Sequence, residues 1–370
     1  MARFSAASAF THSSPERTAV LMIQLGTPDA PETSAVRRYL REFLSDPRVV
    51  EIPRLVWALI LNGIILNVRP SKSAQKYATV WTEEGSPLLC HTVAQAAQLS
   101  QALQARGHDV EVAWAMRYGN PSIPKVMREL RERNVTRLLV LPMYPQYAGS
   151  TTATAFDQVF RELMQWRNQP ELRLIRGFHA HGPYIDALAS HIEAYWSREG
   201  RPDQLLMSFH GVPKRTLLMG DPYHCECLVT ARLLATRLGL AKGQYRVTFQ
   251  SRFGKAEWLQ PYTDATLREL GESGVGRLDV VCPGFVADCL ETLEEIAMEG
   301  RETFIEAGGR DFRYLGCLND AEPFAMALAR LVESHAGGWP TLLAGPGEAA
   351  VRDQALADRL ERACALGAER

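Results

Sequence analysis

His210 is a candidate base or metal ligand because of where it stands in the sequence. It ends the apolar run LLMSFH, and Gly211-Val212-Pro213 follow at once and stop a strand. In α/β sheets ligands bind at the carboxyl ends of the strands. A neutral imidazole there can accept a proton near pH 7 or bind a metal ion, whereas a histidine packed in a core does neither. The residue type and its position leave both interpretations open.

A row of carboxylates follows a second apolar run, VVCPGF, in the segment DCLETLEEIAMEG. At α-helical spacing its acidic residues share one face, since residues three or four apart are neighbours on a helix. One interpretation is a solvated acidic surface. The other is a set of oxygen ligands that leads a divalent cation or protons inward. The residues concerned are Asp288, Glu291, Glu295 and Glu299.

A third group of polar side chains follows the apolar run VTRLLVLP, in the segment YPQYAGSTTAT. Its hydroxyl groups can cap the next helix or bind a substrate carboxylate at a helix N-terminus. Arginines elsewhere could add charge-assisted contacts of the same kind. By contrast, DPYHCEC lacks the second ligand pair of a structural zinc site and is better explained as a helix start. The candidate binding residues are Tyr144, Ser150, Thr151, Arg69, Arg117 and Tyr118.

The elements that must position these residues alternate along the chain. Apolar runs such as TAVLMIQLG, VEVAWAMRYG and YRVTFQSR are separated by amphipathic stretches such as SAVRRYLREFL and CLVTARLLATRLGL. Adjacent apolar residues without alternation indicate strands covered on both faces. Strands that alternate with helices predict parallel sheets flanked by helices. The expected fold class is therefore α/β.

An internal similarity divides this α/β chain into two parts. MIQLGTP resembles MSFHGVP, which places Leu25 opposite His210, and NVTRLLVLP resembles GVGRLDVVCP. Two Rossmann-like halves with a ligand cleft between them explain this better than one continuous sheet. The expected segments are a flexible lead over 1–18, an N-terminal half over 19–170, a C-terminal half over 171–334 and a tail over 335–370.

The apolar segment LVWALILNGIIL, residues 55–66, does not fit a soluble α/β plan. It has about half of the ~20 residues that cross a bilayer. It is either a buried core helix or an apolar lip that dips into a membrane surface or closes over an apolar ligand. Asn62-Gly63 in its middle favours a bent helix.

Composition and the usual motifs limit the function. The net charge of −1 over 370 residues argues against non-specific nucleic-acid binding, which needs a basic surface. Dinucleotide, P-loop and nucleophile-elbow signatures do not occur in the sequence. The N-terminal stretch does not resemble a secretory signal, so the seven cysteines are expected to be reduced and the protein cytoplasmic.

Taken together, the motifs make the chain similar to the ferrochelatases. LGTP, RPSKSAQKY, MRYG, YPQYAGSTTAT, SFHGVP, GDPY, FQSRFGKAEWLQP and CLETLEE occur in the family's order, from about residue 20 to residue 332. The resemblance implies insertion of Fe²⁺ into protoporphyrin IX with release of two protons, the last step of haem synthesis. It also implies two Rossmann-like halves with a porphyrin cleft between them.

The resemblance also implies roles for matching residues. His210 and Glu291 correspond to the family's active-site histidine and glutamate, taken as iron ligands or proton acceptors, and Asp288, Glu295 and Glu299 to a metal or proton relay. Residues 53–68 match a hydrophobic lip, which implies peripheral contact with the inner membrane through residues 55–66. The positions that would line the macrocycle or its propionates are Leu25, Arg69, Arg117, Tyr118, Tyr144 and Trp258.

Departures from the family pattern refine these expectations. Some relatives hold a [2Fe–2S] cluster on four cysteines, but this tail carries Cys364 alone and Gly149 stands where such members can have Cys, so no cluster and no cofactor beyond substrate Fe²⁺ are expected. Cys289 stands where many relatives have His. Leu25, where coproporphyrin-type relatives tend to have Tyr, favours protoporphyrin. The rival functions are a coproporphyrin-specific or cobalt chelatase and a non-catalytic porphyrin carrier.

Overall fold

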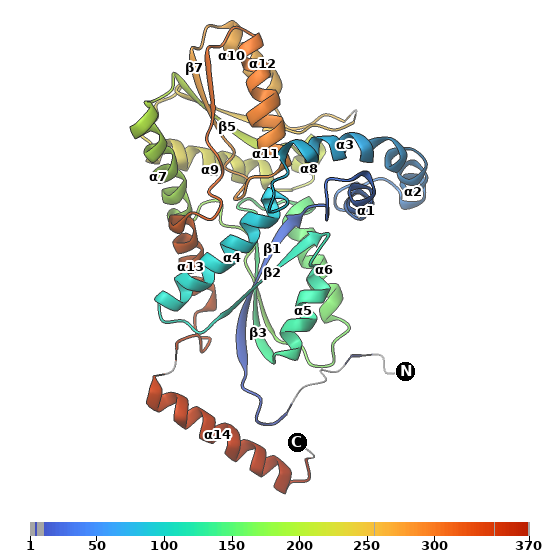
Figure 1. The fold of residues 1–370 in the computed structure, drawn as a ribbon, viewed down its shortest axis with the longest axis vertical. Helices are drawn as coiled ribbons and strands as arrows, with labels where there is room; N and C mark the ends of the chain where they lie inside the picture. The colour runs from blue at the N-terminus through green and yellow to red at the C-terminus, as the bar shows by residue number, and fades with distance from the viewer. Residues whose placement is uncertain (1–3, 6–10, 255, 344, 369–370) are drawn as a thin grey trace.

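The computed structural model describes residues 4–5, 11–254, 256–343 and 345–368. Two four-stranded sheets form its frame, and each strand pairs in parallel with its neighbours (Figure 1). This confirms the predicted α/β class with two parallel sheets flanked by helices. The strands are β1 (Arg17–Gly26), β2 (Glu111–Tyr118), β3 (Val135–Pro142), β4 (Glu171–Leu174), β5 (Gln204–His210), β6 (Tyr245–Gln250), β7 (Arg277–Val281) and β8 (Asp311–Tyr314).

Helices connect the strands and cover both sheets, and three short segments among the described residues are π-helices, named η. They are α1 (Thr33–Leu44), α2 (Arg54–Ile60), η1 (Leu61–Ile65), α3 (Leu66–Val80), α4 (Pro87–Ala105), α5 (Ile123–Glu132), η2 (Gly149–Ala153), α6 (Thr154–Leu163), α7 (Gly182–Glu199), α8 (Lys214–Leu218), α9 (Tyr223–Arg237), α10 (Thr263–Glu272), α11 (Leu290–Thr292), η3 (Leu293–Gly300), α12 (Arg301–Glu306), α13 (Glu322–Ala336) and α14 (Pro346–Ala365).

The two sheets repeat one topology. Their strand orders are β2-β1-β3-β4 and β6-β5-β7-β8, so β1 has the same place in the first sheet as β5 has in the second. Leu25 lies one residue before the end of β1, and His210 ends β5. The sequence similarity between the two strands therefore reflects equivalent positions in the two halves, as the sequence predicts.

The predicted boundary at residue 170 is wrong by one strand. β4 pairs with β3, with Arg137 opposite Glu171 and Val140 opposite Leu174, so the first half extends at least to residue 174. β4 has four residues and stands at the sheet edge, with none of them fully buried. The order of elements along a chain does not say which sheet an edge strand joins, because that choice is made by tertiary pairing.

One apolar core joins the two halves. The largest cluster of buried hydrophobic side chains contains Met22 and Leu139 of the first sheet together with Leu205 and Phe209 of the second. Helix α13 follows β8 of the second sheet, yet it packs against α4 and α7 and also contacts β3 (Figure 1). The two halves therefore fold as one body, which fixes the spacing of the strand ends between them.

Residues 53–68 form neither a buried core helix nor a membrane span. The chain runs through α2, η1 and α3 as a projecting helical arm (Figure 1). Trp57, Leu61 and Leu66 pack inward, and the Trp57 Nε1 donates to the Leu44 carbonyl at 2.6 Å. We name the outward apolar side chains the apolar lip: Leu55, Val56, Leu59, Ile64 and Val68, which are 52–85% exposed. In the part of the chain described, no helix is long and apolar enough to cross a bilayer.

The expected bend of this arm takes the form of the π-helical turn η1. The Asn67 side-chain amide donates to the carbonyl oxygens of Asn62 at 3.0 Å and Gly63 at 2.9 Å. The wider π turn frees these carbonyls from the regular α pattern, and Asn67 satisfies them. The predicted bend at Asn62-Gly63 is thus stabilised by a side chain five residues further on.

Gly26 is required where β1 ends beside β2. Its φ of +110° suits glycine, and a Cβ built there would lie 1.7 Å from the carbonyl oxygen of Tyr118. A side chain at this position would push the ends of β1 and β2 apart. The close approach keeps Leu25 and the neighbouring strand end in register.

Gly26→Ala should lower the free energy of unfolding by about 3 kcal/mol or more, because it combines a positive φ with a backbone clash. Gly63→Ala is the matched control, since its added Cβ meets nothing within 4 Å. It should be neutral or stabilising by up to about 1 kcal/mol. Urea unfolding followed by circular dichroism measures both, and equal effects would contradict the argument.

Candidate active site

His210 stands at the carboxyl edge of the second sheet, half-buried. Its Nδ1 lies 2.6 Å from the carbonyl oxygen of Gly211. Because a carbonyl oxygen can only accept, Nδ1 carries the proton in this arrangement. Nε2 then keeps its lone pair in the neutral ring, and that lone pair is what a general base or a metal ligand uses. The ring of Phe285 lies 6.3 Å away between centroids and covers one side of the imidazole.

Glu291 lies in the short helix α11, between β7 and η3. Its backbone carbonyl accepts from Gln250 Nε2 at 2.7 Å, which ties it to the end of β6. Burial, then the Glu291 charge and the Cys289 thiol, raise the pKa of Tyr77 well above its ordinary value. Burial, Tyr77 and Glu291 do the same to the pKa of Tyr39. The Glu291 carboxyl group is therefore close to two phenols that stay protonated at neutral pH.

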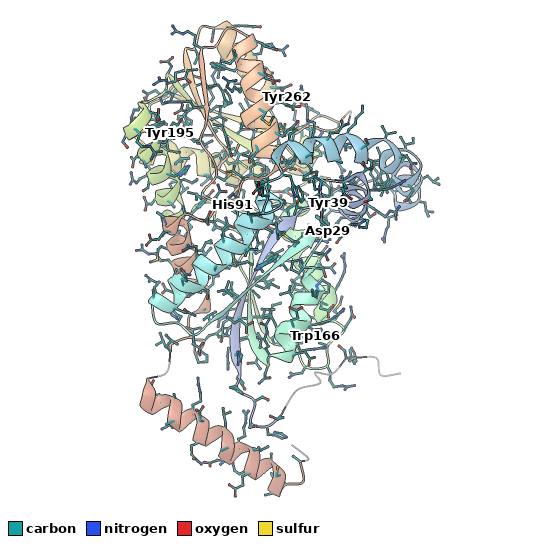
Figure 2. The ribbon with its side chains drawn as sticks, in the orientation of Figure 1. Asp29, Tyr39, His91, Trp166, Tyr195 and Tyr262 are labelled. Atoms are coloured by element: carbon teal, nitrogen blue, oxygen red, sulfur yellow. The ribbon has the colours of Figure 1, made fainter. Side chains whose placement is uncertain are left out.

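Neither phenol is among the candidate site residues predicted from the sequence. Tyr39 comes from α1 and lies near the middle of the molecule (Figure 2). It donates to the Gly26 carbonyl at 3.2 Å, and its ring meets that of Tyr77 edge-on at 6.5 Å. Tyr77 belongs to the motif RPSKSAQKY and could have been found there, whereas Tyr39 sits in an ordinary amphipathic helix without any signal.

Asp288 does not continue a row with Glu291, and the expectation of one shared α-helical face is wrong. It is buried, and its carboxylate accepts from Thr292 Oγ1 at 2.9 Å, the Tyr314 hydroxyl at 2.6 Å and Asn319 Nδ2 at 2.8 Å. These bonds use its oxygens within the protein. Asp288 anchors the start of α11 and thereby positions Glu291.

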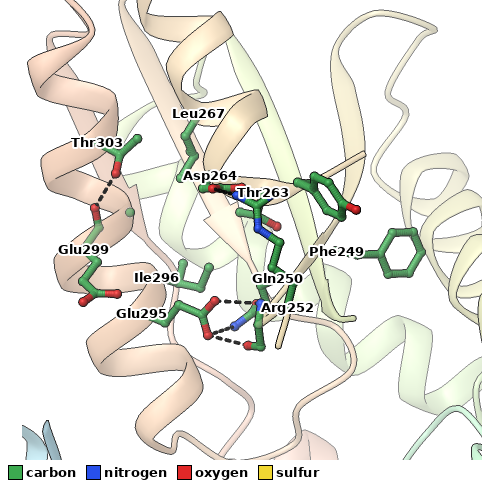
Figure 3. Close-up of a pocket in the computed structure, with 13 residues that line it drawn as sticks. Phe249, Gln250, Arg252, Thr263, Asp264, Leu267, Glu295, Ile296, Glu299 and Thr303 are labelled. Atoms are coloured by element: carbon green, nitrogen blue, oxygen red, sulfur yellow. Dashed lines mark hydrogen bonds and ion pairs between the residues drawn. The ribbon is translucent and has the colours of Figure 1, made fainter. Parts of the chain in front are cut away.

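Glu295 and Glu299 lie further along, on the π-helix η3, where hydrogen bonds run from i to i+5 and the α-helical spacing no longer applies. Glu299 accepts from Lys76 Nζ at 2.9 Å, and the same ammonium lies 2.7 Å from Glu294. Both Glu295 and Glu299 line a pocket of about 230 Å³ between η3 and the segments that follow β6 (Figure 3). Among the described residues, no three His, Cys, Asp or Glu side chains are grouped to hold a metal ion.

Arg117 and Tyr118, which the sequence predicts as substrate-binding residues, lie inside the protein. The Arg117 guanidinium is buried and donates to Asp46 and to Thr154 Oγ1, the latter at 2.7 Å. The Tyr118 hydroxyl donates to Asp46 at 3.0 Å. A buried charge needs such a partner, and Asp46 has no motif that marks it in the sequence.

The segment after β3 is held by acidic residues at the start of α9. The backbone N–H of Gly149 donates to Asp221 and that of Tyr147 to Glu226, each at 2.7 Å. This places Ser150 and Thr151 in η2, half-buried. In the described part of the chain the hydroxyl of Tyr144 is buried without a hydrogen-bond partner. Burial also raises its pKa, so it remains a neutral donor.

Leu25, Arg69 and Trp258 come from three different elements. Leu25 is half-buried at the end of β1. The Arg69 guanidinium lies 4.4 Å above the ring of Phe253, and partial burial lowers its pKa. The Trp258 ring lies close to Gly211, beside His210, and its Nε1 donates to the Phe253 carbonyl at 2.8 Å. Trp258 is thus next to His210. Arg69 contacts Phe253, whose carbonyl accepts the hydrogen bond from Trp258.

Two parallel four-stranded sheets of one topology define an α/β fold that solved chelatases share. SirB from Bacillus subtilis, solved with Fe³⁺, matches 89% of this chain and 100% of its own with a TM-score of 0.51 at 11% identity. The sirohydrochlorin chelatase SirB from Bacillus subtilis subspecies spizizenii, in complex with cobalt, matches 88% of this chain and 99% of its own with a TM-score of 0.50, also at 11% identity. At this identity the likeness concerns the fold.

Within that fold class, the chain belongs to the ferrochelatase family. The family model named Ferrochelatase matches residues 17–336. The ferrochelatase of Janthinobacterium sp. (strain Marseille) is 59% identical over 334 residues, which are 90% of this chain and 91% of the relative. That of Herminiimonas arsenicoxydans is 58% identical over 360 residues, 97% and 98% of the two chains. Membership assigns to this protein the insertion of iron into a porphyrin during haem synthesis.

Asp46→Asn should lower the free energy of unfolding by about 3 kcal/mol at neutral pH, because it leaves the buried Arg117 charge unpaired. Burial alone would raise the pKa of Asp46, but hydrogen bonds from Thr154 and the Arg48 backbone and the charge of Arg117 outweigh it and lower the pKa. A lowered pKa stabilises the fold above the ordinary carboxyl value of about 4, and this contribution is lost as the pH falls through the lower, folded-state value.

The difference between wild type and Asp46→Asn should therefore shrink as urea unfolding is repeated from pH 7 down to about pH 3. Asp186→Asn is the control, since Asp186 forms an exposed pair with Arg237 at 2.9 Å. It should cost less than about 1 kcal/mol. A pH-independent difference for Asp46→Asn would contradict the assignment.

Proposed function

We propose that the protein inserts Fe²⁺ into protoporphyrin IX to form protohaem, with His210 and Glu291 as the working groups. The observation that supports this most directly is their placement: His210 at the end of β5 and Glu291 in α11, joined through Gln250. A carrier would need shape and apolar surface but no base with a defined tautomer. We take protoporphyrin as the substrate on the basis of Leu25, as in the sequence analysis.

In this proposal His210 accepts a pyrrole proton at Nε2. The bond from Nδ1 to the Gly211 carbonyl fixes the ring and its tautomer before substrate arrives. The same carbonyl stabilises the imidazolium that forms, because Nδ1–H becomes a stronger donor when the ring is charged. The porphyrin N–H bond breaks, its electron pair stays on the pyrrole nitrogen, and the proton leaves with His210.

Glu291 is proposed to bring iron or to take the second proton. The carboxylate is a hard oxygen ligand suited to Fe²⁺, and the neutral phenol of Tyr77 near it is a donor that can stabilise its charge. Asp288 acts indirectly, by holding the start of α11. Glu299 remains a proposed relay on the outer part of η3, where Lys76 balances its charge.

The macrocycle is proposed to lie between the ends of the two sheets. Leu25 and Trp258 supply apolar and aromatic walls, and a site shaped for a bent ring would turn the pyrrole nitrogens toward the metal. The unpartnered Tyr144 hydroxyl, Ser150, Thr151 and Arg69 are proposed donors for the ring edge or propionates. Arg117 and Tyr118 support this set from inside the protein.

We propose that the enzyme works without a resident cluster or other cofactor. The seven cysteines are free thiols, and Cys364 is exposed on α14, the helix near the C-terminal end of the chain (Figure 1). Cys282, Cys289 and Cys317 are buried. Burial, together with the Asp288 charge and Cys282, raises the pKa of Cys317 well above its ordinary value, which disfavours the thiolate that metal binding requires.

His210→Ala and Glu291→Gln should each lower kcat by about two to four orders of magnitude, the range for loss of a proton-transfer group. The assay is anaerobic and follows loss of protoporphyrin fluorescence with Fe²⁺. His335→Ala, at the far end of α13, is the control and should retain activity. Porphyrin binding by wild type without insertion of any divalent metal would support a carrier and contradict the proposal.

We also propose that a cytoplasmic form of the protein contacts the inner membrane peripherally through residues 55–66. The apolar lip exposes large apolar side chains to solvent, such as Leu55 at 85% and Leu59 at 77%, where a helix that faces water would carry polar ones. Leu218 and Met219 at the end of α8 add exposed apolar surface. An ion pair of 2.8 Å between Arg215 of α8 and Glu51 ties this surface to the start of the arm.

Leu59→Asp should weaken binding to anionic phosphatidylglycerol vesicles by about tenfold or more. It replaces a leucine that would be buried in the lipid with a negative charge that the anionic lipid repels. Co-sedimentation with vesicles measures this. Val351→Asp, on the exposed helix α14, is the control and should bind like wild type. Equal binding by both variants and wild type would show that the apolar lip only shields the porphyrin.

A further inference from the structure

Glu295 meets an unusual backbone position at the end of β6. Ser251 has a φ of +64°, a left-handed conformation that residues with a Cβ avoid. The backbone N–H of Ser251 donates to Glu295 Oε1 at 2.7 Å, and its hydroxyl donates to Oε2 of the same carboxylate (Figure 3). Gln250 Nε2 adds a longer contact of 3.5 Å to Oε2. The strained residue is thus held by both oxygens of one side chain.

The chain that leaves Ser251 carries two rings toward the porphyrin site. Phe253 lies under the Arg69 guanidinium at 4.4 Å, and Trp258 packs against Gly211. The Trp258 Nε1 closes the segment by donating to the Phe253 carbonyl at 2.8 Å. The direction in which this segment leaves β6 is set at Ser251, because a change from left-handed to ordinary φ there would turn everything that follows.

The far end of the segment is fixed independently next to His210. Pro213 and Trp258 form an isolated bridge, and the backbone N–H of Leu259 donates to the Val212 carbonyl at 3.0 Å. The near end is held by Glu295 at Ser251 and, one residue further on, by Arg252, which pairs with Asp264 and lies 4.4 Å over the ring of Tyr262. We propose that Glu295 is a positioning residue that sets the porphyrin-facing segment through Ser251, rather than a ligand or relay for iron. This inference rests on the proposed porphyrin site.

The same contacts argue against a relay at this position. A carboxylate that binds a divalent cation must offer lone pairs to it, and both Glu295 oxygens already accept hydrogen bonds from Ser251. A cation bound to either oxygen would compete with these bonds for the charge of the carboxylate and weaken the hold on the strained residue. The two roles therefore predict different responses to substitution, which separates them experimentally.

Four variants distinguish the roles: Ser251→Ala, Ser251→Gly, Glu295→Gln and Glu295→Ala. Ser251→Ala removes one of the two bonds and leaves the Glu295 charge, so KM for protoporphyrin should rise about three- to tenfold with KM for Fe²⁺ unchanged. Ser251→Gly loses the same bond but relieves the positive φ, so it should lie closer to wild type. Glu295→Gln keeps an acceptor oxygen and should rescue most of the effect of Glu295→Ala.

Glu302→Gln, an exposed carboxyl group on the neighbouring helix α12, is the matched control. The inference is overturned if Glu295→Gln raises KM for Fe²⁺ as much as Glu295→Ala while Ser251→Ala behaves like wild type. Quenching of protein fluorescence by protoporphyrin, measured without iron, gives the affinity of each variant independently of turnover. If wild type binds porphyrin without inserting metal, the proposed function fails, but the order of affinities still tests the role of Glu295.

Discussion

The apolar core that the two sheets share is the constraint on which the site depends. Residues of β1 and β3 pack in one cluster with residues of β5 and β6, and α13 returns from the second sheet to close over α4. Close-packed interiors tolerate little change in volume, so the two sheets have little freedom to shift against each other. A ligand between the strand ends therefore meets walls whose spacing is set far from the ligand itself.

Buried charges fix the details that apolar packing leaves free, since hydrophobic contacts have little directionality. Asp46 holds Arg117 and Tyr118 behind the first sheet, and Asp288 anchors α11. In the second sheet Asp279 is fully buried. Its carboxylate accepts hydrogen bonds from Arg313 Nε at 2.6 Å and from Trp196 Nε1 at 2.7 Å. Each carboxylate has several donors, as a buried charge requires, and each therefore specifies one arrangement of its neighbours.

The π-helical segments give the site its local shape. η1 bends the arm that carries the apolar lip, η2 begins where α9 holds the segment after β3, and η3 follows Glu291. In a π turn the backbone hydrogen bonds run from i to i+5. On η3 Glu295 accepts from Ser251 and Glu299 accepts from Lys76, while both side chains line one pocket. Carboxylates that look equivalent in the sequence have become separate groups with separate partners.

The sequence by itself determined the fold class, the repeat of two halves, the candidates His210 and Glu291 and the family. Hydrophobic periodicity and the order of motifs can be read from the sequence alone, because they do not depend on which distant residues pack together. Tertiary structure alone decided that β4 joins the first sheet, that Arg117 is buried against Asp46, and that the charge of Glu291 acts on the buried phenols of Tyr39 and Tyr77. These outcomes depend on pairs far apart in the chain, such as Asp46 and Thr154, whose contact has no local signature. Their physical basis is burial, which forces each charge and hydroxyl to find a partner wherever the fold brings one.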